Sequence, residues 1–329
     1  MISKKELALL ALILVVGAVT YSINPRFLSA VNIGNMANLV GLFGIFALGV
    51  GLVIISGGIE LSVGSMFAIL GVIFLDLFAN IGLSWPLALA AAVGLGLLLG
   101  LIHGLLVTKA GLQPFVVTLC GLLIYRGAAR FYTSDSTMGF GYGVEDAFLR
   151  WLVSDRTMGV PHTFIAFLII AAAMAVLLHG SVYGRHLYAV GKNEEAARYS
   201  GIRTGRVITM TYVICGGLAG LTAVFIVFYT NSVSPSSHGS FYELYAIAAA
   251  VLGGCSLRGG EGSVIGIMLG VVLLQVLQNL VNLLGIPSSL NFAVMGSVIL
   301  LGVLADQEIT RRRKRSLAEA GALAAKGGK

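Results

Sequence analysis

Ser56-Gly57-Gly58-Ile59-Glu60-Leu61-Ser62-Val63-Gly64-Ser65 separates two long apolar runs, at about 35–55 and 63–81. Glycine admits unusual backbone conformations and serine favours helix starts. We therefore expect one helix to stop here and another to begin, with Ser62 as its N-cap. The stretch is either a tight cytoplasmic turn or an irregular segment at membrane depth, which requires surrounding protein or a water-filled cavity. The sequence leaves both open, and with them whether Glu60 faces substrate, lipid or another subunit.

The composition of the whole chain is strongly apolar. Of its 329 residues, 57% are hydrophobic and only 11% are charged, against roughly 25% charged in a soluble domain. So few charges cannot cover a water-facing surface, and so many apolar residues exclude a disordered chain. The apolar runs are continuous over about 20 residues, whereas membrane β-barrels show short alternating segments. The sequence predicts an all-α polytopic membrane protein.

Ten apolar runs are candidates for spanning helices, because a span needs about 20 mostly apolar residues. We expect them at about 7–23, 35–55, 63–81, 86–108, 113–130, 163–180, 207–229, 243–255, 263–284 and 290–305, of which the eighth is short. The first follows two lysines but precedes no convincing cleavage site, so we interpret it as an uncleaved span. Residues 1–305 then form one transmembrane domain, and 306–329 form a basic tail.

The charges of the loops orient these spans. Residues 181–206 contain five basic side chains and two acidic ones, so this loop is predicted to be cytoplasmic. The long loop at 131–162 has four acidic side chains and two basic ones, and the loop at 230–242 has no basic residue, so both are predicted to be external. The block Arg311–Arg315 places the tail inside, where it meets anionic lipid rather than nucleic acid. Ten spans, with both termini cytoplasmic, satisfy every assignment.

The motifs of a self-sufficient enzyme or pump are missing. The sequence has no phosphate-binding loop, zinc-binding helix or nucleophile elbow, and its three cysteines match no metal site. His103 and His179 are interpreted as hydrogen-bonded helix contacts. Glu60 and Asp76 are the acids near membrane depth, too few for a proton relay. We expect no enzymatic activity, no metal and no cofactor bound by this chain, and an energy source elsewhere.

Two further patterns involve glycine. The stretch from Gly253 to Val264 again places a Gly-Gly pair, a charge and a Gly-Ser pair between two apolar runs, which hints at an internal repeat. Gly96, Gly100 and Gly104 recur every four residues in one predicted span. That spacing is typical of a helix-packing face.

One predicted span carries four amide side chains at the spacing i, i+3, i+4, i+7, which places them on one helix face. They are Gln275, Gln278, Asn279 and Asn282, and Asn291 extends the polar wall outward. Amides in hydrocarbon are unfavourable unless paired, so this face turns toward other helices or a watery cavity. Neutral amides both donate and accept hydrogen bonds, which suits sugar hydroxyls, although they also join helices together. We interpret the face as the lining of a substrate pathway.

The cytoplasmic loop contains the signals of a short helix at about 194–200. Asn193 is a good N-cap, Glu194 lies in the first turn and Gly201 is a natural terminator. This helix is either a solvated turn or a small surface that docks on another protein. The residues alone leave both open.

The first glycine-rich stretch resembles the signature of permease subunits of bacterial ATP-binding-cassette (ABC) importers for monosaccharides. The resemblance is carried by Ser56, Gly57, Gly58, Glu60, Ser62, Gly64 and Ser65. Members usually have Asp where this chain has Glu60. The stretch from Gly253 to Gly266 is similar to the family's second glycine-rich segment, and the resemblance covers roughly residues 30–305.

The resemblance implies a function and a set of partners. It implies that a small neutral sugar crosses a bacterial inner membrane, that a separate ATPase subunit uses the ATP, and that a second permease and a periplasmic sugar-binding protein complete the importer. The ATPase would dock at Gly191, Asn193, Glu194, Ala197 and Gly201. Two rivals remain: an ABC permease for a nucleoside or signalling sugar, and a stand-alone ion-coupled carrier.

Overall fold

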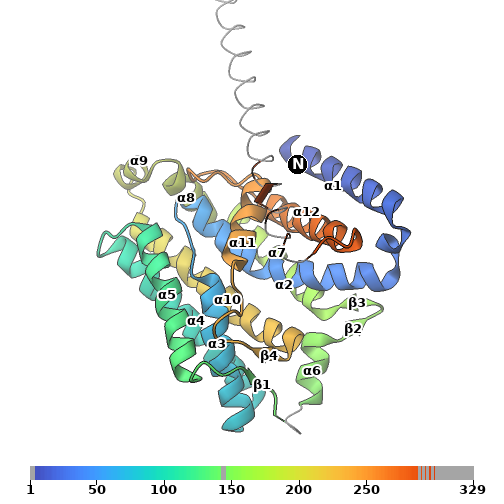
Figure 1. Cartoon of the computed structure of the whole chain (residues 1–329). Coiled ribbons are helices and arrows are strands. Elements are labelled where there is room, and N and C mark those ends of the chain that lie inside the picture. Colours follow the sequence, from blue (N-terminus) through green and yellow to red (C-terminus); the bar gives the residue numbers. More distant parts are fainter. Residues whose placement is uncertain are drawn as a thin grey trace, which may run out of the picture.

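The computed structural model describes residues 4–141 and 146–287, with scattered positions between 290 and 300, and this part of the chain is a bundle of helices (Figure 1). The α-helices are α1 (Lys4–Ile23), α2 (Ala30–Ile55), α3 (Val63–Leu75), α4 (Trp85–Thr108), α5 (Pro114–Tyr132), α6 (Ala147–Ser154), α7 (His162–Ala175), α8 (Val182–Lys192), α9 (Glu194–Tyr199), α10 (Thr204–Thr230), α11 (Tyr242–Leu252) and α12 (Val264–Leu283). A 3₁₀ turn, η1 (Pro25–Leu28), follows α1, and π-helical turns η2 (Asp76–Asn80) and η3 (Val176–Gly180) extend α3 and α7.

Two short antiparallel strand pairs complete the architecture. β1 (Met138–Gly139) pairs with β4 (Ser232–Val233), and β2 (Arg156–Thr157) pairs with β3 (Val160–Pro161). The first pair ties together the two loops that the charge pattern predicts to be external. The all-α prediction is confirmed.

Eight helices in the described residues are long and apolar enough to cross a membrane, and they match eight of the ten predicted spans. The predicted span at 243–255 is the eleven-residue α11, which reaches about 16 Å and cannot cross the hydrocarbon alone. The predicted span at 290–305 falls largely outside the described residues.

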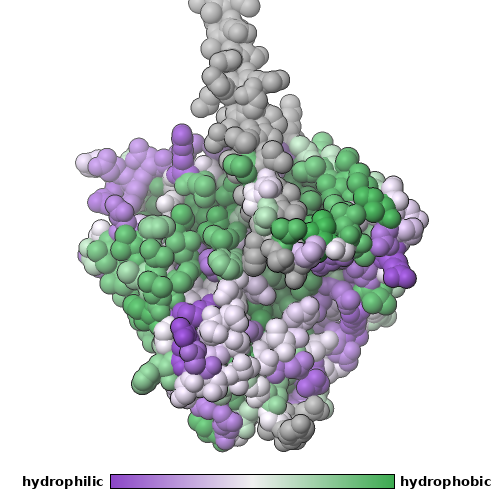
Figure 2. Space-filling view, in the orientation of Figure 1, coloured by the Kyte–Doolittle hydropathy of each residue, from purple (hydrophilic) through white to green (hydrophobic). Residues whose placement is uncertain are grey.

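The burial of the helices separates a core from a lipid-facing surface. α2 lies at the centre and packs against α7, α10, α11 and α12, so most of its side chains are buried. α1, α4 and α5 present rows of exposed large apolar side chains, such as Leu14, Leu98 and Ile124. Figure 2 shows this apolar surface on the left, where Figure 1 places α4 and α5, and at the upper right over α1. In water such a surface would be highly unfavourable, whereas lipid covers it.

The glycine face of α4 packs against α10. A Cβ atom added at Gly96 would overlap the carbonyl oxygen of Gly216, and one added at Gly100 would overlap that of Tyr212. Close backbone contact of this kind replaces the hydrophobic effect as a source of helix association in lipid. The helix-packing interpretation of this glycine spacing is confirmed.

The loop before α11 reaches deeper into the bundle than an external loop would. Gly239 packs directly against Gly64 at the start of α3. Arg126 of α5 donates hydrogen bonds to the carbonyl oxygens of Pro235 (3.0 Å) and His238 (2.8 Å), so carbonyls that no helix satisfies keep a partner. The second half of the loop at 230–242 therefore enters the bundle and leads into the short α11. The prediction that this loop is external stays a prediction.

Candidate functional site

The first glycine-rich segment joins the ends of α2 and α3, and its Glu60 and Ser62 are buried whereas Gly57 is exposed. Its Ile59 carbonyl accepts hydrogen bonds from the Tyr212 hydroxyl (3.2 Å) and the Thr118 hydroxyl (3.4 Å). Tyr212 lies eight residues inside α10, about 12 Å from the end of that helix. Ile59 is thus irregular backbone whose carbonyl is satisfied by protein, as the alternative at membrane depth requires. The depth of the segment in a membrane stays a prediction.

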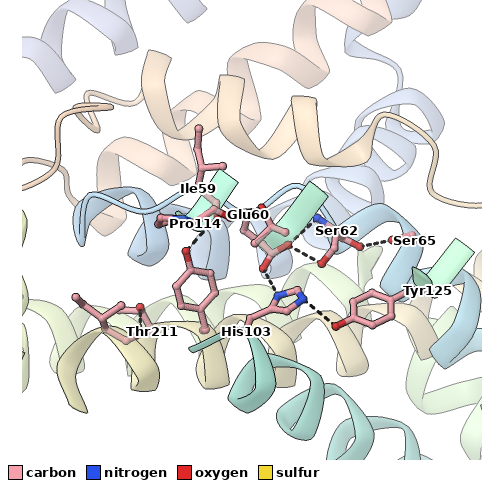
Figure 3. Close-up of polar contacts among 11 residues, drawn as sticks. Ile59, Glu60, Ser62, Ser65, His103, Pro114, Tyr125 and Thr211 are labelled. Carbon is pink, nitrogen blue, oxygen red and sulfur yellow. Dashed lines mark hydrogen bonds and ion pairs between the residues drawn. The ribbon is translucent and has the colours of Figure 1, made fainter. Parts of the chain in front are cut away.

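Glu60 is the centre of a buried hydrogen-bond network in this segment (Figure 3). Its residue is 1% exposed. One carboxylate oxygen accepts from the backbone nitrogen and the hydroxyl of Ser62, both at 2.6 Å, and the other lies 3.0 Å from Nδ1 of His103. A neutral imidazole that donates from Nδ1 accepts at Nε2 from the Tyr125 hydroxyl, 2.8 Å away. Glu60 therefore faces protein, rather than substrate, lipid or a partner subunit.

Ser62 and its neighbours fill narrower roles than the sequence suggested. Ser62 occupies the N-cap position of α3, but its hydroxyl donates to Glu60 instead of capping the helix. Ser65 donates to the carbonyl oxygen of Ser62, and Ser56 donates to that of Val53 at the end of α2. These hydrogen bonds therefore fix how the end of α2 and the start of α3 lie relative to each other.

The partnership of His103 with Glu60 is a site feature that sequence reasoning missed. His103 was expected to make a hydrogen-bonded helix contact, but without an identifiable acid, because Glu60 lies 43 residues earlier. The available signal was that one histidine and one acid both fall at membrane depth. Such groups are seldom left unpaired in lipid.

The two glycine-rich segments meet loop 181–206, which is predicted to be cytoplasmic, at one contact. The Gly260 nitrogen donates to the Ile55 carbonyl oxygen at 2.8 Å, which joins the second segment to the end of α2. A Cβ atom added at Gly191 would overlap the same carbonyl oxygen, and one added at Gly259 would lie 2.6 Å from the Gly191 oxygen and 2.9 Å from Gly57. We call this contact, made by Ile55, Gly57, Gly191, Gly259 and Gly260, the glycine junction.

The short helix predicted in the cytoplasmic loop is confirmed as α9. The Asn193 side chain caps it by accepting from the Ala196 nitrogen at 2.9 Å. Glu194 accepts from Arg198 and from Thr204, which fastens α9 to the start of α10. Gly201 follows the helix with a φ of +84°, a conformation that favours glycine.

The residues expected at the docking surface are not equally accessible. Gly191 lies in the glycine junction and Ala197 lies on the buried face of α9, so both support the loop from inside. Asn193 and Glu194 are exposed, and Tyr199 is 89% exposed. The docking role of this set stays a prediction.

The four amides of α12 line one open cavity of about 280 Å³. Its other wall comes from α2, and the lining consists of Asn32, Asn35, Met36, Leu39, Gln275, Gln278, Asn279, Asn282 and Leu283. Asn279 and Asn32 exchange two hydrogen bonds across it, at 2.8 and 3.0 Å. The amides of α2 were not predicted, although their i, i+3 spacing was a usable signal. Asn291 lies outside the described residues.

Comparison with known proteins identifies the class. The chain matches the family described as "Branched-chain amino acid transport system / permease component" over residues 32–303, and it belongs to this family. It is 37% identical to the ribose import permease protein RbsC of Escherichia coli K12 over 305 residues, 93% of each chain. It is 38% identical to a probable ABC transporter permease protein of Sinorhizobium fredii, over 94% of this chain and 91% of the relative. The fructose import permease protein FruF of Bifidobacterium longum is 34% identical, with 85% and 80% covered. No solved structure matches.

The chain is thus a membrane permease of an ABC importer. This class separates the translocation path from the ATPase. The structure agrees with this division: amides of α2 and α12 line one cavity, and α9 lies in a separate loop.

Proposed function

We propose that this permease passes a small neutral sugar through the cavity between α2 and α12. The observation that carries the proposal is the lining itself: six neutral amides and three apolar side chains, with no charged group among the described lining residues. Each amide offers both a donor and an acceptor, and sugar hydroxyls need both. The sugar permeases among the relatives support the same substrate class.

The family description also names branched-chain amino acids, which are the second candidate substrate. An amino acid carries a carboxylate and an ammonium group, and both are unfavourable at membrane depth without charged or strongly polar partners. Among the described lining residues the polar side chains are all amides, one of which, Asn35, accepts a hydrogen bond from Arg156 at 2.9 Å. The neutral lining therefore favours a sugar over an amino acid.

The test of this path replaces one amide in cells that carry the whole importer. Gln278→Leu keeps the size of the side chain but removes its hydrogen bonds, and we expect at least a tenfold fall in uptake of labelled monosaccharide. Leu283→Met, a near-isosteric change in the same wall, is the matched control and leaves uptake unchanged. Equal uptake by both variants would contradict the assignment. Competition by unlabelled ribose, nucleoside and leucine separates the proposed substrate from its rivals.

We also propose that α9 docks into the ATPase subunit through Asn193, Glu194 and Tyr199, and that Gly191 and the inward-facing Ala197 support this surface. Gly201 sets the direction in which the chain leaves α9, and a β-branched residue is strained at its positive φ. Gly201→Val should uncouple ATP hydrolysis from transport while the chain still inserts into the membrane. Gly201→Asn, which tolerates that conformation, is the control and stays coupled. Unchanged transport by Gly201→Val would remove this assignment.

The orientation and assembly follow from the same proposal. α9 lies at one end of the molecule, and β1 and α6 lie at the opposite end (Figure 1), which supports the placement of loop 181–206 and loop 131–162 on opposite sides of a membrane. We place α9 and the tail 306–329 in the cytoplasm of a bacterium, and loop 131–162 at the outer face of its inner membrane, next to a periplasmic sugar-binding protein. Affinity purification from gently solubilised membranes should recover the ATPase and a second permease copy or relative. Recovery of the chain alone under crosslinking would contradict this assembly.

A further inference from the structure

The hairpin formed by β2 and β3 lies against the first turns of α2 (Figure 1). Its turn consists of Met158 and Gly159, whose positive φ angles are typical of a two-residue turn that joins antiparallel strands tightly. Thr163, which follows the hairpin in α7, donates a hydrogen bond from its hydroxyl to Oδ1 of Asn38 on α2. The hairpin is therefore held on the same helix that lines the amide cavity.

A buried histidine fixes the shape of this hairpin. His162 is 9% exposed, and its Nδ1 donates to the carbonyl oxygen of Trp151 at 2.7 Å, because a carbonyl can only accept. In the neutral ring Nε2 accepts from the Thr157 hydroxyl, also at 2.7 Å. These two bonds connect α6 to β2. The backbone that carries Arg156, the residue before Thr157, is thus placed by contacts other than its own.

Arg156 extends from β2 to a residue of the cavity wall. Its Nη2 donates to Oδ1 of Asn35 at 2.9 Å. A Cβ atom added at Gly34 would overlap Nη1 of Arg156, so the guanidinium lies directly on the backbone of that glycine. Asp155 accepts from the backbone nitrogen of Arg156 at 2.8 Å, and no described carboxylate forms an ion pair with the guanidinium. The guanidinium is therefore directed to the Asn35 amide.

This contact decides which atom of Asn35 faces the cavity. A guanidinium has only donors, so the atom that meets it must be the amide oxygen. The amide nitrogen is left for the cavity, and no described residue accepts a hydrogen bond from it. Asn32, by contrast, uses both its oxygen and its nitrogen in the exchange with Asn279. A hydrogen bond from a charged donor also polarises the amide, which makes the N–H groups of Asn35 better donors.

We propose that Arg156 is a positioning residue of the substrate pathway: it holds the amide nitrogen of Asn35 toward the cavity and gives that wall a positive potential. The proposal rests on the proposed function for the identity of the pathway. Arg156 is not among the lining residues, so it acts through Asn35 and through its charge. The wall then accepts an oxygen atom of the substrate and disfavours an ammonium group, which needs acceptors and is repelled by a cation.

The substrate class becomes narrower as a result. A hydroxyl or ring oxygen of a sugar accepts from the Asn35 nitrogen. An amino sugar or a free amino acid would bring an ammonium group to the same wall. We therefore expect polyhydroxy compounds without an amine to be the substrates of this cavity.

The first test measures the potential in the cavity without any substrate. Met36, which lines the cavity next to Asn35, is replaced by cysteine, and Cys120, the exposed native cysteine, is replaced by serine. In the reconstituted permease–ATPase complex, the thiol is modified by a methanethiosulfonate with a sulfonate end or by one with a trimethylammonium end. Arg156→Gln should lower the ratio of the anionic to the cationic reagent rate about fivefold or more, because it removes a positive charge near the thiol.

Matched variants keep this result decisive. Arg130→Gln removes an equal charge from α5, which packs against α3 and α4, and should leave the ratio unchanged. Arg156→Lys keeps the charge but loses the planar fork, so it should keep most of the ratio. Arg156→Met preserves an unbranched stem over Gly34 and should give the same fall as Arg156→Gln if that variant fails to assemble. An unchanged ratio in either assembled neutral variant, or an equal fall in Arg130→Gln, would overturn the proposal.

The second test measures uptake of labelled ribose by the whole importer. Gly34→Ala leaves the charge of Arg156 in place but adds a carbon atom where Nη1 lies, so the guanidinium must shift away from Asn35. We expect maximal uptake to fall about threefold or more, the effect of one weakened hydrogen bond. Gly127→Ala, on an open face of α5, is the matched control and keeps uptake. Equal uptake by the two variants would overturn the positioning role.

The two tests separate this proposal from the proposed function. The thiol rates involve no substrate, so a changed ratio without ribose uptake would reject the sugar and keep the role of Arg156. Ribose uptake with an unchanged ratio would reject the role of Arg156 and keep the sugar.

Discussion

Removal of the Glu60 side chain is the sharpest test of how the first glycine-rich segment, between α2 and α3, is held in place. Glu60→Ala would leave three donors without their acceptor: the backbone nitrogen of Ser62, its hydroxyl and Nδ1 of His103. Leaving one buried donor without its acceptor costs about 1–3 kcal/mol of unfolding free energy. We expect Glu60→Ala to destabilise the complex by at least that amount, because it affects three donors.

Two milder substitutions, Glu60→Gln and Glu60→Asp, should lower the unfolding free energy by smaller amounts. Glu60→Gln keeps an acceptor for Ser62 and turns an amide group toward His103, whose neutral ring can accept in its other tautomer. Its cost should be about 1–2 kcal/mol, of the order of one weakened hydrogen bond. Glu60→Asp introduces the residue that is usual at this position in the monosaccharide-importer permeases whose signature the segment resembles, but it shortens the side chain by one methylene. It should weaken either the Ser62 contact or the His103 contact.

The assay is thermal unfolding of the purified complex, with Glu261→Ala as the control. Glu261 makes an ion pair with Lys192 in which both side chains are more than half exposed, so its loss should cost at most about 1 kcal/mol. In a double-mutant cycle, His103→Ala should cost much less in the Glu60→Ala background than in wild type. Additive costs, or equal unfolding temperatures for Glu60→Ala and Glu261→Ala, would refute the network as the support of this segment.

Three other predictions use the same complex. Gly100→Leu forces α4 away from the Tyr212 carbonyl and should abolish stable assembly, whereas Gly127→Leu, on an open face of α5, should not; detergent size-exclusion profiles distinguish them. Asn193→Ala removes the cap of α9 at about 1 kcal/mol, and we expect weaker ATPase binding in a titration while the bundle keeps its unfolding temperature. Arg126→Gln should loosen the loop before α11, measured as faster protease cleavage between the β4 strand and α11; cleavage at the wild-type rate would argue against a holding role.

Much of the bundle could be predicted because lipid imposes a simple rule: a span must be long and apolar. α1, α4 and α12 follow that rule almost residue for residue. The rule cannot predict α11, because its eleven residues are too few to span a membrane and it begins where the preceding loop has already entered the bundle. Local cap chemistry predicted α9 well, since Asn193 and Gly201 act within one turn of the chain.

The interior of the site was harder to predict because its contacts join helices that are distant in sequence. The one-face spacing of the α12 amides predicted a polar wall, but the facing Asn32 and Asn35 could not be assigned without knowing that α2 is its neighbour. The contact between Glu60 and His103 could not be predicted for the same reason, because the two residues lie 43 positions apart in the sequence. A lone Arg126 in an apolar span was a signal that an intramembrane charge has a task.

The glycine junction connects three parts of the chain through backbone contacts. Its backbones touch because Gly191, Gly259 and Gly260 have no side chains, so loop 181–206 meets the end of α2 without flexible side chains between them. Rigid backbone contact transmits displacement better than long side chains do. This contact joins the loop that carries α9 to α2, which lines the amide cavity. It is the route by which the proposed docking at α9 would act on that cavity.

The measurement that tests the substrate and the energy source together is ATP-driven uptake by the reconstituted complex. The permease, its ATPase and its binding protein are placed in liposomes with ATP on the ATPase side, and labelled ribose and labelled leucine are offered in parallel. The account predicts ribose uptake that requires ATP and falls at least tenfold with Gln278→Leu, and no leucine uptake above background. ATP-driven leucine uptake without ribose uptake would contradict it.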